Sequence, residues 1–252
     1  MSPSLVKKKI GQPFIQLDTI ASTNSYAIDR LQANLAAHGT VFFAHNQTGG
    51  KGQRGKQWFT EPGSNIILSV IVDCSALLIH QQFRLSAVVA LACHDFYAQF
   101  AGDGTTIKWP NDIFWRDRKA AGILIENVIR GNNWAWAIIG IGMNINQTTF
   151  SGEAKNPVSL KQITGQNFDV VETAKSLCNC LEKRYQQMLH DDFKHLLNDY
   201  NFHLYKAKQE VKLKKNSAIF KCVIDGVNEY GQLLVKNAVQ DSFGFGEIEW
   251  VI

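Results

Sequence analysis

Four strand-length stretches follow one another between residues 105 and 141, separated only by short turns. They cover residues 105–108, 113–115, 121–128 and 134–141. The turns between them are rich in proline, asparagine, aspartate and glycine, the residue types that favour tight reversals of the chain. A crossover between parallel strands needs a dozen or more residues, which these turns do not provide. The four stretches therefore predict an antiparallel meander.

Patterns typical of helices and of further strands surround the meander. Strands are predicted at 40–43 and 65–72. An amphipathic helix is predicted to follow Ser22-Thr23-Asn24, because a side-chain hydroxyl or amide can accept from the unpaired N–H groups of a first helical turn. Longer helices are predicted through 83–100, 171–188 and 193–200. Residues 1–204 are thus expected to form an α+β domain, with a mixed, largely antiparallel sheet backed by helices.

The composition excludes several classes of protein. Apolar residues make up 45% of the 252, which is enough to bury a substantial core, and the net charge of +4 is too small to require nucleic acid. The longest apolar stretches, 66–72 and 135–141, are far shorter than the roughly 20 residues that span a bilayer. No apolar segment follows the lysines at 7–9, so no secretory signal is expected. These features predict a cytoplasmic protein without a membrane partner.

The five cysteines are expected to stay reduced. They are an odd number in a chain too long to need disulfides for its stability: Cys74, Cys93, Cys178, Cys180 and Cys222. Cys178 and Cys180 lie two positions apart in a predicted helix and so point to different faces. The sequence names no metal ligand.

Residues 205–252 have a different character, with short alternating stretches and glycine turns at 218–224, 226–231, 233–235 and 244–250. This part is predicted to form a small β-barrel of SH3-like size. Its start is rich in lysine: Lys206, Lys208, Lys212, Lys214, Lys215 and Lys221. These lysines are interpreted either as a solvated sheet edge or as a docking surface for an acidic partner.

A glycine-rich run at 49–58 matches two nucleotide-binding patterns, GxGxxG and GxxxxGK. The phosphate-loop pattern needs Ser or Thr where Gln57 stands, and both patterns need a helix to begin at the loop. Only ten residues separate Gly55 from the strand at Ile66, which is too few for a crossover helix. Both assignments are therefore rejected. The glycine N–H groups and the nearby Lys51, Arg54 and Lys56 still predict binding of an anionic ligand.

Five segments in order resemble the biotin protein ligase family. They are Ser22-Thr23-Asn24, 47–58 (QTGGKGQRGKQW), 108–112 (KWPND), 119–126 (KAAGILIE) and 140–144 (GIGMN). A weaker match is Ser159-Leu160 with Thr164-Gly165. The resemblance implies a catalytic domain related to class II aminoacyl-tRNA synthetases, followed by an SH3-like domain. It also implies the short form, without the operator-binding winged helix of some members, since the catalytic signature begins near residue 18.

The resemblance implies an ATP-dependent ligase that forms biotinyl-5′-AMP, releases pyrophosphate and transfers biotin to a lysine of a biotin carboxyl carrier protein. Magnesium would accompany ATP, and a homodimer is possible. Lys119 and Lys108 are implied as catalytic. The implied biotin-binding residues are Ser22, Thr23, Asn24, Gln47, Gly50, Lys51, Gly52, Gln53, Trp58, Lys119 and Gly122. The implied ATP and adenylate residues are Arg54, Lys56, Lys108, Asn111, Asp112 and Asn144.

The loop departs from the family pattern at two positions. Gln53 stands where an arginine is usual, Arg54 comes one residue later, and Lys56 replaces a second arginine. Lysine cannot reproduce the two-pronged contact of a guanidinium with phosphate. Whether Gln53 or Arg54 holds the adenylate phosphate therefore stays open.

Three other functions compete with biotin ligation. A lipoate or octanoate protein ligase would use the same adenylate chemistry, but the polar Ser22-Thr23-Asn24 and Gln47 suit a ureido ring better than an apolar tunnel. A nucleic-acid-binding module could use the lysines from 206 to 221. A scaffold without catalysis is disfavoured by Lys119 and the glycine-rich loop.

Overall fold

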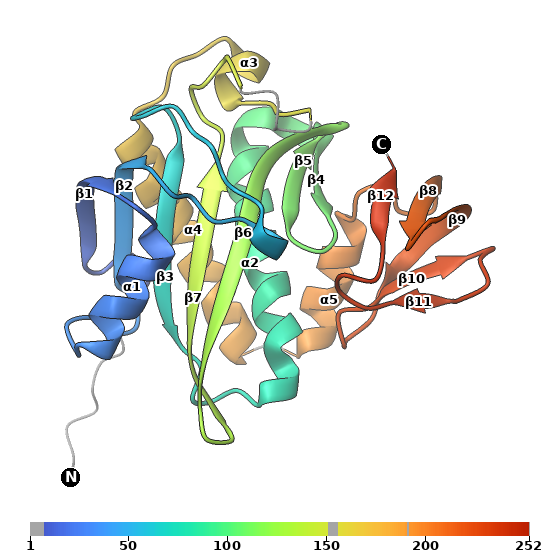
Figure 1. The fold of residues 1–252 in the computed structure, drawn as a ribbon, viewed down its shortest axis with the longest axis horizontal. Coiled ribbons are helices and arrows are strands. Elements are labelled where there is room, and N and C mark those ends of the chain that lie inside the picture. Colours follow the sequence, from blue (N-terminus) through green and yellow to red (C-terminus); the bar gives the residue numbers. More distant parts are fainter. Residues whose placement is uncertain (1–7, 151–155, 191, 252) are drawn as a thin grey trace.

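A seven-stranded mixed sheet forms the centre of the molecule (Figure 1). The computed structural model describes residues 8–150, 156–190 and 192–251. The strands lie in the order β1-β2-β3-β7-β6-β5-β4. Their bounds are β1 Phe14–Ile20, β2 Val41–Gln47, β3 Ile66–Asp73, β4 Thr105–Lys108, β5 Asp112–Trp115, β6 Arg118–Arg130 and β7 Asn133–Met143. The predicted meander is confirmed, because β4, β5, β6 and β7 pair with one another in antiparallel succession.

The helices cover the two faces of this sheet unequally. On one face lie α2 (Gln82–Ala101) and α4 (Val170–His190), which pack on the large apolar cluster that includes Leu68, Val70 and Ile139 (Figure 1). On the other face α1 (Thr23–Gln32) packs Ala27 and Leu31 against Phe42, Ile71 and Ile138. Since α1 is only ten residues long, it leaves part of this second face to the loops.

Several elements follow the sequence signals closely. Ser22 caps α1, its hydroxyl accepting from the Ser25 N–H as the sequence predicts. The weak Ser159-Leu160 and Thr164-Gly165 match is a short capped helix, α3 (Leu160–Thr164), with Gly165 in the left-handed conformation. All five cysteines are free thiols.

Other elements differ from the sequence prediction. The first strand, β1, was not predicted; it pairs in parallel with β2 across α1 and is only partly buried, so its apolar pattern is weak. The second unpredicted strand, β8 (Glu210–Lys215), carries four charged residues among six. Part of the predicted stretch at 226–231 is a turn, because β9 (Ala218–Val227) ends early and Asn228 Oδ1 accepts from the Tyr230 and Gln232 N–H groups.

A second, five-stranded antiparallel sheet lies beside the first (Figure 1). Its order is β11-β10-β9-β8-β12, with β10 at Leu233–Lys236, β11 at Ser242–Phe243 and β12 at Glu249–Val251. It agrees with the small SH3-like unit predicted from the sequence. The proposed domain division after residue 204 falls between α5 (Phe193–Phe202) and β8.

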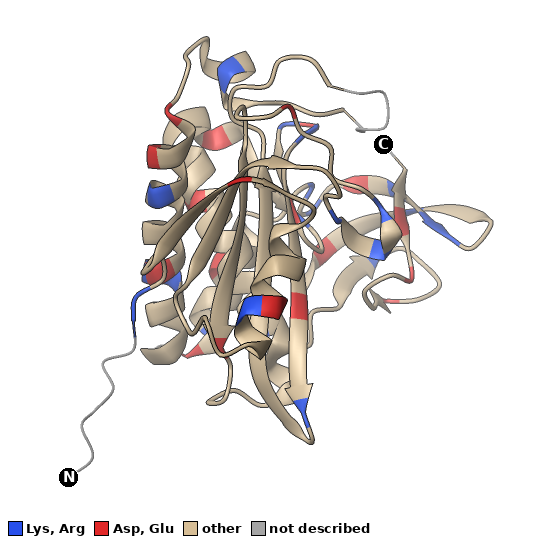
Figure 2. Cartoon of the chain, turned by 60° about the vertical axis from the view of Figure 1, so that its left-hand side comes forward, with Lys and Arg blue, Asp and Glu red and all other residues tan. Residues whose placement is uncertain are grey.

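Two tryptophans join the second sheet to the first. Trp109 Nε1 donates to the Gly231 carbonyl at 2.9 Å, and Trp250 Nε1 donates to the Trp109 carbonyl at 3.1 Å. Trp109 belongs to the turn between β4 and β5, so this turn is held from both sides by the second sheet. Acidic and basic residues are intermixed over both parts of the molecule (Figure 2).

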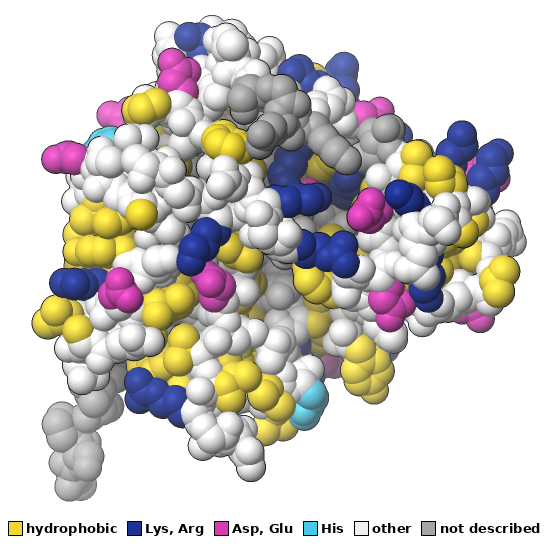
Figure 3. Space-filling view, viewed as in Figure 1, with side chains coloured by type: hydrophobic (Ala, Val, Ile, Leu, Met, Phe, Trp, Pro, Cys, Tyr) yellow, Lys and Arg dark blue, Asp and Glu magenta, His cyan; other side chains and the backbone are white. Residues whose placement is uncertain are grey.

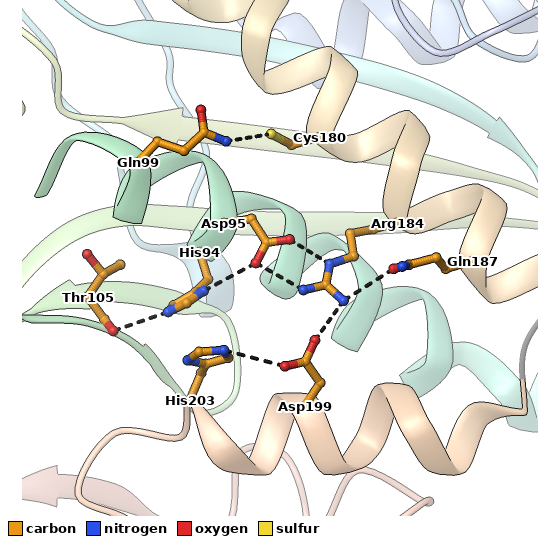
Figure 4. Close-up of polar contacts among 9 residues, drawn as sticks. All are labelled: His94, Asp95, Gln99, Thr105, Cys180, Arg184, Gln187, Asp199 and His203. Carbon is orange, nitrogen blue, oxygen red and sulfur yellow. Dashed lines mark hydrogen bonds and ion pairs between the residues drawn. The ribbon is translucent and has the colours of Figure 1, made fainter. Parts of the chain in front are cut away.

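A polar cluster ties α5 to α2 and α4 (Figure 4). Arg184 contacts Asp95 through Nε (2.6 Å) and Nη2 (3.0 Å), and Asp199 through Nη1 (2.6 Å). The His94 and His203 rings lie 3.8 Å apart between centroids, each beside one of the two carboxylates. Burial alone would raise the pKa of Asp95, but hydrogen bonds from His94 and Arg184 and the Arg184 charge lower it to about 2.

This pKa predicts an acid-dependent loss of stability. An aspartate whose pKa is lowered on folding stabilises the protein above its unfolded pKa, near 4, and loses that contribution as the pH falls toward 2. We expect Asp95→Asn to lower the free energy of unfolding by about 2 kcal/mol at pH 7, and the difference from wild type to shrink between pH 4 and pH 2. Thermal unfolding at pH 7, 4 and 2.5 measures both, with the exposed Asp103→Asn as control. A difference that does not change with pH would contradict the assignment.

Candidate active site

A cavity of about 60 Å³ opens on the face of the large sheet that α1 leaves uncovered. It lies between the start of α1, the glycine-rich loop and strands β3, β6 and β7. On the corresponding side of the molecule, several lysine and arginine side chains border a hollow near its middle (Figure 3). The cavity is thus bounded by a flat sheet below and by polar and cationic loops above.

Three glycines make the floor of this cavity flat. Gly122 of β6 pairs directly with Gly142 of β7, and Gly140 lies two positions along the same face of β7. A Cβ atom at Gly142 would collide with the indole of Trp58, and one at Gly140 with the amide of Asn24. The indole and the amide can therefore lie against the sheet only because these positions carry no side chain.

Neutral hydrogen-bonding groups gather at the α1 end of the cavity. Gln47 Oε1 accepts from the Thr23 backbone N–H at 2.9 Å, and Asn24 Nδ2 donates to Glu126 Oε2 at 2.6 Å. Ser22, Thr23 and Asn24 are each less than 5% exposed, and all three line the cavity together with Gln47. The four side chains that line this end of the cavity thus offer hydrogen bonds and are themselves uncharged.

A lysine stands at the other end. Lys119 Nζ forms an ion pair with Asp112 Oδ1 at 2.7 Å and lies 5.7 Å from the centroid of the Trp58 ring. The Trp58 Nε1 atom is buried and has no hydrogen-bond partner among the residues that the structure describes. Asn111, on the same side, donates from Nδ2 to the Ile123 carbonyl at 2.8 Å. A cationic side chain therefore lies at this end of the cavity, which suits an anionic ligand.

The glycine-rich loop folds back on itself as a small hairpin. The Gly52 N–H donates to the Lys56 carbonyl (2.7 Å), and the Trp58 N–H donates to the Gly50 carbonyl (2.9 Å). Within it the only helical feature is the 3₁₀ turn Gln53–Gly55, so no α-helix begins at this loop. Lys51 Nζ donates to Ser25 Oγ at 2.8 Å and fastens the hairpin to α1.

The structure brings together most, but not all, of the residues predicted for the site. Those that line the cavity are Ser22, Thr23, Asn24, Gln47, Lys51, Gly52, Gln53, Trp58, Asn111, Lys119 and Gly122. Two others contact Lys119: Asp112 through its ion pair, and Asn144 through a 3.3 Å bond from Nδ2 to the Lys119 carbonyl. Gly50 does not line the cavity, but its carbonyl accepts a hydrogen bond from the Trp58 backbone N–H.

Three predicted cations lie elsewhere. Lys108 Nζ lies 4.5 Å from the Phe114 ring centroid and 5.4 Å from that of Trp250. Arg54, in the left-handed conformation, donates from Nη2 to the Gly246 carbonyl of the second sheet's unit. Lys56 is exposed and does not line the cavity. A role for these side chains at a phosphate stays a prediction.

Several residues of the site were not predicted from the sequence. Gly140, Gly142, Ile67 and Leu124 line the cavity, and Ser69 and Glu126 bond to residues that do. One signal was present: two glycines separated by one residue inside a strand lie on the same face and leave it bare. Ser69 had no such signal, because it stands in an otherwise apolar strand.

Comparisons with known proteins agree with this geometry. "Bifunctional ligase/repressor BirA" of Bacillus subtilis is 33% identical over 187 residues, covering 73% of this chain. The chain spans 57% of the length of that relative. "Biotin--[acetyl-CoA-carboxylase] ligase" of Paracoccus denitrificans is 27% identical over 221 residues, which cover 85% of this chain and 90% of that protein.

Solved structures show the same fold. A structure described as biotin protein ligase from Aquifex aeolicus in complex with biotin and ATP superposes with a TM-score of 0.78, covering 94% of this chain and 97% of that one at 23% identity. The family model described as "Biotin/lipoate A/B protein ligase family" matches residues 17–144, which contain the cavity's α1, loop and sheet residues. The chain belongs to the biotin/lipoate A/B protein ligase family.

Proposed function

We propose that the chain is a biotin protein ligase, which joins biotin to AMP and then to a lysine of a carrier protein. The observation that carries the proposal is the cavity itself, with neutral hydrogen-bonding groups at one end and Lys119 at the other. Biotin has the matching shape, a ureido ring at one end and a carboxylate at the other. Two relatives named biotin--[acetyl-CoA-carboxylase] ligase support it.

In the first step a biotin carboxylate oxygen attacks the α-phosphorus of ATP, and the bond from that phosphorus to the pyrophosphate oxygen breaks. Both reactants are anions, so catalysis depends on bringing them together and neutralising their charge. The Lys119 ammonium lies at the cavity, where its ion pair with Asp112 holds it in place and offsets part of its charge. Lys51, Gly52 and Gln53 also line the cavity, so this part of the loop can contact a phosphate there.

In the second step the acceptor lysine amine attacks the carbonyl carbon of biotinyl-AMP. An amide bond forms, AMP leaves with the electron pair of the broken anhydride bond, and the amine loses a proton. In this step the protein must protect the mixed anhydride from hydrolysis by water. The hairpin loop with Trp58 lies over the cavity and suits this task.

Magnesium fits as a companion of the nucleotide. No group of three or more His, Cys, Asp or Glu side chains among residues 8–150, 156–190 and 192–251 is arranged to hold a metal ion. An ion bound by the triphosphate would need few protein ligands, and Asp112 is the predicted nucleotide-side residue that has a carboxylate. When bound, magnesium would neutralise charge on the phosphates.

Lipoate ligation is the nearest alternative, since the family includes both activities. A dithiolane ring has no N–H or C=O group, so binding it would leave the buried Thr23 and Asn24 and the cavity-lining Gln47 without ligand partners. The polar end of the cavity therefore favours biotin. Competition between biotin and lipoate for adenylate formation tests this choice.

A nucleic-acid or acidic-protein partner for the lysine-rich segment is less well supported. Four of the six lysines of this segment pair with carboxylates: Lys206 with Asp117, Lys208 with Asp225, Lys215 with Glu247, and Lys221 with Glu210. Their charge is therefore compensated within the chain. None of the helices in the described ranges has the length and apolar character needed to cross a membrane.

The direct test is incubation of the purified chain with a carrier domain, biotin and Mg-ATP, followed by mass spectrometry of the carrier. We expect a mass increase equal to one biotinyl group that depends on both biotin and ATP. A carrier that gains lipoate but not biotin would replace this proposal with lipoate ligation.

Lys119→Ala is expected to lower the rate of biotin-dependent exchange between pyrophosphate and ATP at least 100-fold while the chain stays folded. It removes a charge at a partly enclosed site, where such an interaction is worth roughly 3 kcal/mol in the transition state. Lys119→Arg should restore only part of the rate, because the planar guanidinium group cannot occupy the position of the compact lysine ammonium. The variant Lys194→Ala, at an exposed lysine of α5, is the control. An unchanged exchange rate in Lys119→Ala would rule out this role.

Arg54→Gly is expected to release the reactive adenylate and to raise biotin labelling of a bystander protein such as serum albumin. The substitution removes the contact that ties the loop to Gly246, so the loop can open. Gln53→Gly should raise bystander labelling less. More labelling from Gln53→Gly than from Arg54→Gly would show instead that Gln53 retains the adenylate.

A further inference from the structure

Five polar side chains form a continuous chain of contacts along the neutral end of the cavity. They come from four elements: Gln47 from β2, Thr23 and Asn24 from α1, Ser69 from β3 and Glu126 from β6. Ser69 Oγ lies 2.8 Å from Thr23 Oγ1 and 2.5 Å from Asn24 Oδ1. Ser69 is fully buried, and Thr23 and Asn24 are 4% and 3% exposed, so these contacts are protected from water.

The donor and acceptor roles are fixed at both ends of this series of contacts. At one end the Thr23 backbone N–H can only donate, which fixes Gln47 with Oε1 toward Thr23. At the other end two oxygens accept from Asn24 Nδ2, the Glu126 carboxylate at 2.6 Å and the Leu124 carbonyl at 3.4 Å. The shorter bond, to Glu126, holds Asn24 with Oδ1 toward Ser69. Neither amide can turn over without losing its bond.

These two fixed ends determine where the hydroxyl hydrogens of Ser69 and Thr23 point. Asn24 Oδ1 has no hydrogen, so the hydrogen in its 2.5 Å contact must belong to Ser69. Ser69 has only one hydrogen, so Thr23 is the donor in the 2.8 Å contact; this acceptor lies nearer to Thr23 Oγ1 than the alternative, Gln47 Oε1, at 3.2 Å. Thr23 Oγ1 also lies 3.2 Å from Gln47 Oε1, the longest of these contacts, and Gln47 keeps the backbone N–H of Thr23.

We propose that Glu126 is a positioning residue that sets which groups of the cavity donate and which accept. Acting through Asn24 and Ser69, it leaves Thr23 Oγ1 with lone pairs for a ligand N–H, while Gln47 keeps its Nε2 hydrogens for a ligand C=O. A cyclic urea carries one carbonyl and two N–H groups. The inference rests on the proposed function and deepens it, because Glu126 then selects for a ureido ring without touching it.

The test exchanges the amide and the carboxylate. In Asn24→Asp two carboxylates face each other where Asn24 and Glu126 are now 2.6 Å apart, and we expect the Kd for biotin to rise at least 30-fold at pH 8. In Glu126→Gln the new side-chain amide can present either its oxygen or its nitrogen to Asn24, so the direction at Asn24 is less firmly set. We expect the Kd for biotin to rise three- to tenfold. The double variant places an amide donor opposite a carboxylate and keeps the direction at Ser69, so its Kd should return to within about threefold of wild type.

Two further measurements separate positioning from a general loss of structure. The rise should be confined to KM for biotin, with kcat at saturating biotin and KM for ATP within about threefold of wild type. Ser69→Ala removes the hydrogen bonds between Asn24 and Thr23 without changing charge, and it should raise KM for biotin about as much as Glu126→Gln. The surface variant Glu172→Gln is the matched control, expected to behave as wild type.

Three results would overturn the inference: a double variant as weak as Asn24→Asp, a KM for ATP that rises with that for biotin, or a Ser69→Ala enzyme with unchanged KM for biotin. A wild-type chain that binds no biotin in calorimetry would instead overturn the proposed function, and the inference with it. The two failures are therefore distinguished before any variant is compared.

Discussion

The close pairing of two glycines across β6 and β7 is the constraint on which the rest of the site depends. Gly122 and Gly142 face each other in register, and Gly140 continues the bare strip along β7. Any side chain there would meet Trp58 or Asn24, so the strip is what lets the loop and the start of α1 lie on the sheet. A flat floor between two strands also keeps its shape, because both strands are fixed by antiparallel hydrogen bonds on each side.

The two faces of the large sheet have separate tasks. One is covered by α2 and α4 and holds most of the apolar core, which gives the strands their rigidity. The other is covered only in part by α1, and the uncovered part becomes the cavity. Because α1 begins at the edge of that cavity, its cap and first turn supply both the helix start and the neutral hydrogen-bonding groups of the site.

The second sheet holds two of the loops that surround the site. Trp250 and Gly231 bond to Trp109 in the turn that precedes Asn111 and Asp112, and Gly246 accepts from Arg54 of the hairpin loop. Lys108 lies between Phe114 of the first sheet and Trp250 of the second. The turn before Asn111 and the hairpin loop are thus held by a part of the chain more than 100 residues away in sequence.

The sequence by itself determined the meander, the capped start of α1, the absence of an α-helix after the glycine-rich loop, and the polar and cationic side chains that line the cavity. Each depends on turn chemistry, periodicity or capping, which act over a few neighbouring residues. Only the tertiary structure decided that β1 joins the sheet, that Asp112 holds Lys119, that Arg54 faces Gly246, and that Ser69 and Glu126 support Asn24. These contacts join residues from seven to nearly 200 positions apart, and nothing in the local sequence fixes which distant side chain will meet which.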